Sequence, residues 1–388
     1  MSWLMVKRNK YMNVPEIRFK GLDKTWNKKT LDELVQLNSG MDYKHLCNGN
    51  IPVYGTGGYM LSVNAALSYD KDAIGIGRKG TINKPYILKA PFWTVDTLFY
   101  AIPRKYNNLQ FCNCIFQRID WLKYDESTGV PSLSKNIINS IEVNCAPSYD
   151  EQQKIASYFQ SLDSLIQTTS KKLVSLKQIK DASLQSMFPQ EGETVPKVRF
   201  KGFEGEWEKI PFGSFLKESY ERSTVENEDI LLSSAITGVY LNSELFGHQR
   251  GASNIGYKKI KKNMLILSTQ NLHLGNANVN LRFEHGLISP AYKVYEIVNI
   301  SPLFLQQWIK MDSTKVFFLN ATTAGASLCR KNIVWDDLYK QIVLIPSKNE
   351  QVKIGLFFSN LDKQISLQTQ RLEKLKQIKA ACLDKMFV

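Results

Sequence analysis

The sequence predicts a mixed α/β protein in which two domains with antiparallel-leaning sheets are separated by two long helices that form an antiparallel coiled coil. Three observations predict this fold: the length, an internal repeat and a heptad pattern that occurs twice. At 388 residues, the chain exceeds the size at which a single hydrophobic core keeps growing, so two or more domains are expected. Two repeated halves are too few for a solenoid, and a pseudo-two-fold arrangement is the simpler solution.

The internal repeat has two well-preserved parts. Residues 14–26 and 195–207 are identical at seven of thirteen positions, and both segments end in tryptophan. Residues 147–188 match 346–387 at 20 of 42 positions without a gap. The repeats divide the chain into six segments: an N-terminal signature at 1–26, a first variable domain at 27–146, a central helix at 147–188, a linker with the repeated signature at 189–207, a second variable domain at 208–345 and a C-terminal helix at 346–388.

The repeated helical segments carry apolar residues at alternating spacings of four and three, which is the seam of a coiled coil. Thr169 and Gln368 interrupt the two seams at equivalent points, where a polar residue can fix the register of the pair. An amphipathic helix packed on its own domain is the alternative, but two matching seams in one chain favour pairing. The predicted seam residues are Ile155, Phe159, Leu162, Ile166, Leu173 and Leu176 in the first helix, and Ile354, Phe358, Leu361, Ile365, Leu372 and Leu375 in the second.

The variable domains consist of short β-prone runs punctuated by glycine and proline, with one helix predicted at 302–311. A third, weaker echo precedes each long helix, because residues 129–137 resemble 325–333. The predicted strands lie at 51–60, 72–82 and 91–102 in the first domain, and at 263–269, 288–297 and 341–346 in the second.

A formal charge of +14 and a pI near 9.3 indicate a polyanionic partner. Nucleic acid is the first candidate, and an anionic membrane surface is the second. No 18 apolar residues run together and the six cysteines lack metal-binding or disulfide-scaffold spacing, so we expect a cytoplasmic protein with reduced thiols and no metal site.

Two motifs are similar to cofactor sites but fail in context. Gly75, Gly77 and Gly80 form a GxGxxG pattern, yet Pro85 follows where a dinucleotide site needs a helix. Residues 289–292 (SPAY) lack the second proline of the motif with which methyltransferases hold a flipped adenine. The histidines are scattered and no nuclease carboxylate cluster is evident, so we expect no catalytic residues in this chain.

The paired signatures, the Pro-x-x-x-Glu-Gln-x-x-Ile entry to each long helix and the repeated LKQIK…MF ending together resemble the specificity subunits of type I restriction-modification enzymes. The resemblance covers nearly the whole chain after about residue 14. It implies a non-catalytic subunit that selects a bipartite double-stranded DNA target through two target-recognition domains. It also implies two methyltransferase subunits, with or without restriction subunits, as partners. S-adenosylmethionine and ATP with Mg²⁺ would belong to those partners, and this chain would hold no cofactor.

Other functions stay open on the sequence alone. The chain could be the recognition part of a single-chain methylase-nuclease, or a coiled-coil scaffold that does not bind DNA. The candidate DNA contacts lie in or beside glycine-rich turns or in basic runs: Thr56, Tyr59, Arg78, Lys79 and Lys135 in the first domain, and Tyr257, Lys258, Lys259, Lys261, Lys262, Gln270, Asn271, Arg330 and Lys331 in the second. The candidate docking residues for a methyltransferase are apolar positions off the seam, namely Leu165, Leu184 and Leu383.

Overall fold

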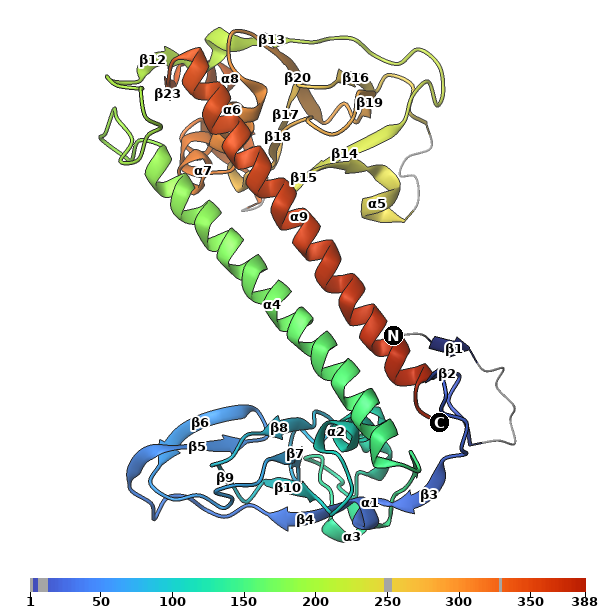
Figure 1. The fold of residues 1–388 in the computed structure, drawn as a ribbon. Coiled ribbons are helices and arrows are strands. Elements are labelled where there is room, and N and C mark those ends of the chain that lie inside the picture. Colours follow the sequence, from blue (N-terminus) through green and yellow to red (C-terminus); the bar gives the residue numbers. More distant parts are fainter. Residues whose placement is uncertain (1–2, 6–12, 248–252, 328–329) are drawn as a thin grey trace. The chain divides into compact units, whose positions relative to one another are not determined.

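The computed structural model of the chain describes residues 3–5, 13–247, 253–327 and 330–388. The chain forms two compact units, the first made of residues 1–171 and 369–388 and the second of residues 172–368. Two long helices, α4 (Tyr149–Met187) and α9 (Lys348–Lys385), each begin in one unit and end in the other (Figure 1). The predicted mixed α/β class with two sheet-containing domains and two long helices is confirmed.

The first unit contains a four-stranded and a three-stranded sheet. The larger has the strand order β4 (Val35–Ser39), β10 (Leu98–Pro103), β7 (Ala73–Gly77), β8 (Tyr86–Leu88), and the smaller has the order β6 (Gly58–Val63), β5 (Asn48–Gly55), β9 (Trp93–Thr94). All neighbours are antiparallel except β5 and β9, which are parallel. The unit also contains two short strand pairs: β1 (Trp3–Met5) with β2 (Ile17–Phe19), and β3 (Asn27–Thr30) with β11 (Glu142–Cys145). Its helical segments are α1 (Leu31–Leu34), α2 (Leu109–Arg118), η1 (Trp121–Tyr124) and α3 (Lys135–Ser140).

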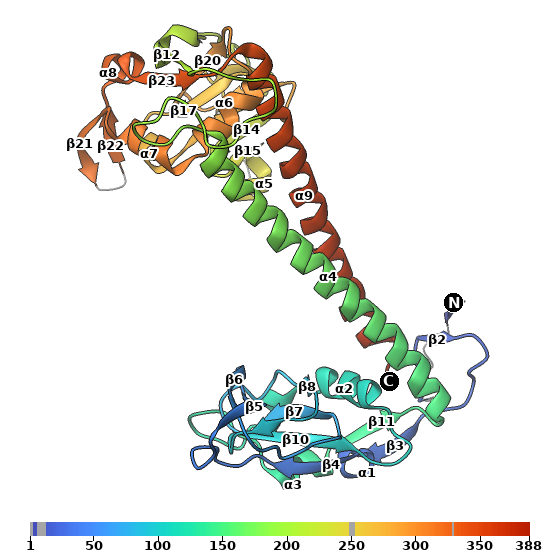
Figure 2. The same cartoon turned by 60° about the vertical axis from the view of Figure 1, so that its left-hand side comes forward.

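The second unit repeats this plan. Its first sheet has the order β13 (Leu216–Glu218), β20 (Tyr292–Ile297), β17 (Leu265–Ser268), β18 (Ala277–Val279), and its second has the order β15 (Gly238–Leu241), β14 (Leu231–Ala235), β19 (His285–Ile288), β16 (Lys258–Lys261). A parallel pair, β14 with β19, recurs in the second sheet. A further strand pair is formed by β12 (Glu208–Pro211) and β23 (Ile342–Ile345), and a hairpin of β21 (Thr322–Ser327) and β22 (Arg330–Ile333) projects from the unit in Figure 2. The helical segments are η2 (Phe212–Phe215), α5 (Asn242–Phe246), η3 (Leu272–Leu274), α6 (Pro302–Ile309), α7 (Asp312–Leu319) and α8 (Trp335–Lys340).

An aromatic cluster in each unit joins the signature segment to both long helices. In the first unit, the Phe387 ring, just after α9, stacks on Phe111 at 5.4 Å and meets Trp26 edge-on at 5.6 Å. In the second unit, Phe188, just after α4, stacks on Phe304 at 5.5 Å and meets Trp207 edge-on at 5.8 Å. Helix α4 therefore starts in the first unit and ends in the core of the second, and α9 starts in the second unit and ends in the core of the first.

A buried clasp ties each signature to the start of a long helix. The Arg18 guanidinium donates to both carboxylate oxygens of Glu151 at 2.7 and 2.8 Å, and Arg199 does the same to Glu350. Trp26 Nε1 also donates to Glu151 at 3.1 Å. Arg18 and Glu151 are separated by 133 positions, so the clasp forms only when the signature folds back onto the helix. The repeated signature is thus a structural part of the junction between strand and helix.

The two long helices contact each other inside both units through equivalent residues. Lys379 pairs with Asp163 at 2.6 Å in the first unit, and Lys180 pairs with Asp362 at 2.5 Å in the second. Along the predicted seams, eight residues are buried and four are half-buried. The buried residues are Ile155, Phe159, Leu162, Leu176, Ile354, Phe358, Leu361 and Leu372, and the half-buried ones are Ile166, Leu173, Ile365 and Leu375.

Candidate nucleic-acid interface

The candidate interface of the first unit is a cleft of about 610 Å³ that contains three cationic side chains. Arg78 and Lys79 follow strand β7, and Lys135 begins helix α3. All three side chains are exposed. The carboxylates of Asp96 and Glu126 also line the cleft. The structure therefore brings together predicted contacts from two segments that lie far apart in the sequence.

Backbone hydrogen bonds position these cations. The Arg78 N–H donates to the Thr97 carbonyl, and the Arg78 carbonyl accepts from the Leu133 N–H, both at 2.8 Å. The Gly80 N–H donates to the Pro131 carbonyl, also at 2.8 Å, and the φ of +94° at this position favours glycine. The loop after β7 is thus held on one side by the start of β10 and on the other by the segment before α3.

The electrostatics of the cleft favour an anion. The Arg78 guanidinium lies 5.8 Å from the centre of the Phe99 ring, and its Nη1 donates to the Asp96 carbonyl at 3.4 Å. Within the part of the chain that the structure describes, neither Lys79 nor Lys135 forms an ion pair. Lysine ammonium groups left unpaired on a surface can bind phosphate oxygens.

The β5–β6 hairpin brings Thr56 close to the loop that carries Arg78 and Lys79. A methyl group on Gly80 would lie 3.7 Å from Thr56 Oγ1, so the hairpin tip is beside the loop that carries Arg78. The Tyr86 hydroxyl donates to the Gly55 carbonyl at 2.7 Å, and burial raises the pKa of Tyr86, which keeps this donor protonated. Tyr59, on β6, is 63% exposed and its hydroxyl lies 3.2 Å from Ser62 Oγ.

The second unit places several predicted contacts around the end of β17. Gln270 and Asn271 follow this strand, and the Lys331 N–H donates to the Gln270 carbonyl at 3.4 Å. Lys331 and Lys135 occupy equivalent positions of the weak sequence echo, so both units bring this segment to the loop after a central strand. Arg330 begins β22, but its side chain lies outside the described residues.

The basic run at 257–262 is largely neutralised or buried, which corrects one expectation. Lys258 is only 6% exposed, and burial lowers the pKa of its ammonium, so its side chain is not available to a phosphate. The three other lysines each contact a carboxylate: Lys259 pairs with Glu228, Lys261 with Glu221 at 3.4 Å, and Lys262 with Glu284 at 2.5 Å. Tyr257 is half-buried, and its backbone N–H donates to Ser223 Oγ at 3.0 Å.

One hairpin of the second unit was missed in the sequence. The β14–β15 turn consists of Ile236 and Thr237, as the β5–β6 turn consists of Thr56 and Gly57. The signal that could have revealed it is a shared Thr-Gly-x-Tyr pattern, at 56–59 and 237–240.

The predicted docking residues differ in their surroundings. Leu165 on α4 is 45% exposed. Leu184 packs against the core of the second unit, and Leu383 packs against the core of the first. Leu165 is therefore the member of this set whose side chain is exposed.

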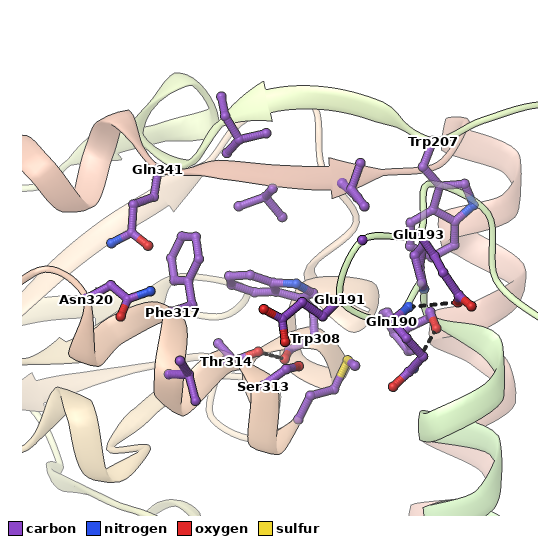
Figure 3. Close-up of a pocket in the computed structure, with 18 residues that line it drawn as sticks. Gln190, Glu191, Glu193, Trp207, Trp308, Ser313, Thr314, Phe317, Asn320 and Gln341 are labelled. Atoms are coloured by element: carbon purple, nitrogen blue, oxygen red, sulfur yellow. Dashed lines mark hydrogen bonds between the residues drawn. The ribbon is translucent and has the colours of Figure 1, made fainter.

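A further pocket, of about 430 Å³, lies in the second unit beside Trp207 (Figure 3). Trp308 and Phe317 form an aromatic wall, and Gln190, Glu191 and Glu193 approach from the linker after α4. The described residues contain no group of His, Cys, Asp and Glu side chains that could hold a metal ion. Among the described helices, none has a stretch apolar and long enough to cross a membrane.

One solved structure agrees with this architecture across nearly the whole chain. The S subunit of a type I restriction-modification system from M. genitalium has a similar structure, with a TM-score of 0.65 and 16% identity over 97% of this chain and 99% of that chain. The HsdS subunit from Thermoanaerobacter tengcongensis gives a TM-score of 0.42 and 15% identity over 94% of this chain and 97% of that chain. None of the curated protein sequences matches this chain.

The chain thus has the fold of a type I restriction-modification specificity subunit. Residues 23–178 match the family model of the type I restriction modification DNA specificity domain, and this match covers the first variable domain and most of α4. The resemblance inferred from the signatures and helix endings is confirmed.

Proposed function

We propose that this chain is the DNA sequence-specificity subunit of a type I restriction-modification complex. It binds a bipartite duplex target, with one half-site for each unit, and it carries methyltransferase subunits to that target. One observation supports this most directly: two units whose strand orders correspond, apart from the additional edge strand β16 of the second, present different side chains around equivalent loops. A duplicated scaffold with divergent loops suits the reading of two different half-sites.

The proposed binding mode separates affinity from sequence choice. The exposed cations Arg78, Lys79 and Lys135 would contact phosphates of the first half-site, and the binding constant would fall as salt rises. Polar side chains such as Thr56, Gln270 and Asn271 would meet base edges in the grooves. The proposed site of action is the cytoplasm, where this DNA is found.

The chemistry would belong to the partners. We propose that the chain neither methylates nor cleaves DNA by itself, that two methyltransferase subunits bring S-adenosylmethionine, and that restriction subunits, where present, bring ATP and Mg²⁺. Leu165 is the candidate docking residue with an exposed side chain.

Mapping of methylated adenines tests the proposal. A host that expresses this chain with its methyltransferase subunits should methylate one bipartite sequence, and a host without the chain should not. Exchange of residues 27–146 for the first domain of a related subunit should change one half-sequence and leave the other unchanged. Methylation that does not depend on the chain, or a simultaneous change in both half-sequences, would refute the two-reader proposal.

A further inference from the structure

The β14–β15 hairpin ends in an exposed apolar and hydroxyl pair. Ile236 is 51% exposed, and Thr237 beside it is also exposed. The turn is short, because Ala235 and Gly238 still pair across the hairpin. The Tyr240 hydroxyl donates to Thr237 Oγ1 at 3.1 Å and so fixes the orientation of the threonine side chain.

A partly buried network of polar groups supports this tip. Lys310 Nζ donates to three acceptors: the Ile236 carbonyl at 2.6 Å, the Ala277 carbonyl at 2.9 Å and Asn278 Oδ1 at 2.6 Å. Asn278, which is fully buried, donates through Nδ2 to Ser234 Oγ and to the Ala235 carbonyl, both at 2.7 Å. The Tyr292 hydroxyl donates to the Ser234 carbonyl at 2.9 Å. Buried networks in which the members are hydrogen-bonded hold a single conformation.

The equivalent hairpin of the first unit has the same construction. The β5–β6 turn also has two residues, and it also contains a threonine, Thr56. The carbonyl just before that threonine accepts from a half-buried donor, the Tyr86 hydroxyl, as the carbonyl of Ile236 accepts from Lys310. In the first unit, this tip lies beside Gly80, the residue that follows Lys79 of the cationic cleft. By the repeated strand order, the tip of the second unit belongs to its recognition surface too.

We propose that Ile236 and Thr237 read base edges of the second half-site, and that Lys310 is a positioning residue that holds them there. This inference rests on the proposed function. A two-stranded ribbon fits the major groove of duplex DNA. The Ile236 side chain would contact a thymine methyl group, and the Thr237 hydroxyl would exchange a hydrogen bond with a neighbouring base edge. The second half-site therefore contains an A·T pair at the position that Ile236 reads.

The test is selection from a duplex library with 40 randomised base pairs, using the full chain co-expressed with its methyltransferase subunits. The variants are Ile236→Ser and Thr237→Val, which change only exposed tip side chains. Val225→Ser is the matched control, because Val225 is an aliphatic residue of the same unit that is 57% exposed. Each tip variant should lose the base preference at one or two positions of the second half-site by roughly fivefold or more. The first half-site and the Val225→Ser selection should match the parent.

Lys310 is tested by the same readout. Lys310→Met should weaken the base preference at the positions affected by the tip variants and at no other positions. Lys310→Arg keeps a cationic donor, so it should retain most of the base preference. A loss of selection over the entire target would indicate a purely structural role and overturn the positioning assignment. Unchanged preferences in both tip variants would overturn the reading assignment while leaving the proposed function intact. Failure of the parent complex to enrich any sequence would instead refute the proposed function.

Discussion

The two units differ far more at their candidate interfaces than at their junctions with the helices. Both use an arginine–glutamate clasp and a stacked phenylalanine pair at the junction. At the interface, Lys79 and Lys135 of the first unit are exposed in a cleft, whereas Lys259 and Lys262 of the second pair with carboxylates. The duplicated residues are those that join the signatures to the ends of the long helices. The residues that diverge are those that would make the half-sites different.

The clasp is the shared feature whose disruption should have the largest effect. Glu151→Ala leaves the Arg18 guanidinium, 2% exposed, without its partner, and should lower the free energy of unfolding by about 3–5 kcal/mol. Glu350→Ala should cost less, because Arg199 is 13% exposed and reaches water more easily. Urea denaturation followed by tryptophan fluorescence measures both losses.

The control for the clasp is an exposed ion pair of the first unit. Glu142→Ala removes the contact with Lys28, whose side chain is 67% exposed, and should change stability by less than about 1 kcal/mol. An equal or greater loss in Glu350→Ala than in Glu151→Ala would show that burial does not distinguish the two clasps.

A second difference concerns the donors beneath the two hairpins, Tyr86 in the first unit and Lys310 in the second. Burial, assisted by Lys180 and Lys315, lowers the pKa of Lys310 from 10.5 to about 8. Below pH 8 the ammonium is charged in both the folded and unfolded states, so the full free-energy cost of burying this charge lowers the stability of the folded state. Between pH 8 and 10.5 the unfolded state binds more protons, so this group adds stability as pH rises. The stability of the parent relative to Lys310→Met should increase by about 2 kcal/mol from about pH 7 to about pH 9.5.

Denaturation curves of the two proteins at several pH values measure that difference, and salt held constant separates it from general charge repulsion. The Tyr86→Phe variant of the first unit serves as the comparison, because it removes the other hairpin donor without removing a lysine. A gap between the parent and Lys310→Met that stays constant across this pH range would contradict the assignment.

A third prediction compares a free lysine with a paired one. Lys79→Ala should weaken binding to duplex DNA about tenfold at low salt and reduce the salt slope by about 0.9, as expected for the loss of one phosphate contact. Lys262→Ala should have less than a twofold effect, because its ammonium already pairs with Glu284 at 2.5 Å. Fluorescence anisotropy of the assembled complex over a range of KCl concentrations provides both numbers. Equal losses in the two variants would remove the electrostatic distinction between the units.

The smallest expected effect on stability is at Leu165, the exposed candidate docking residue. Leu165→Glu should change the free energy of unfolding by less than about 0.5 kcal/mol, because the side chain is already 45% exposed. It should nevertheless reduce co-purification with the methyltransferase subunits. Leu184→Glu should instead destabilise the fold by about 1–3 kcal/mol, since Leu184 packs on the second core. Normal assembly of Leu165→Glu would exclude this face as the docking surface.

The sequence predicted the framework because its contacts recur as residue identities. Arg18 and Arg199, or Phe188 and Phe387, can be matched by eye when the two halves of the sequence are aligned. The repeated strand order of the two variable domains could not be found that way, because backbone pairing imposes a pattern of hydrophobicity but not specific residues.

Candidate contacts were harder to predict than the framework. The sequence showed Lys258 and Lys259 as neighbours in one basic run, yet the burial of the first and the ion pair of the second depend on strands and loops elsewhere in the unit. Arg78 and Lys135 lie far apart in the chain, and only the hydrogen bonds of the intervening loop bring them to one cleft. Burial and pairing are set by long-range contacts that local composition does not contain.

The exchange of helix ends between the units has a consequence for synthesis on the ribosome. The first unit includes residues 369–388, whereas the second consists of residues 172–368. The contact between Tyr158 and Cys382 joins residues 224 positions apart in the first unit. The contact between Lys180 and Asp362 joins residues 182 positions apart in the second unit, so it can form earlier in translation. Domains usually fold in the order in which they emerge. Here the unit that is translated first is completed last, so the nascent chain carries Trp26 and Phe111 without their Phe387 partner until residue 387 has been made.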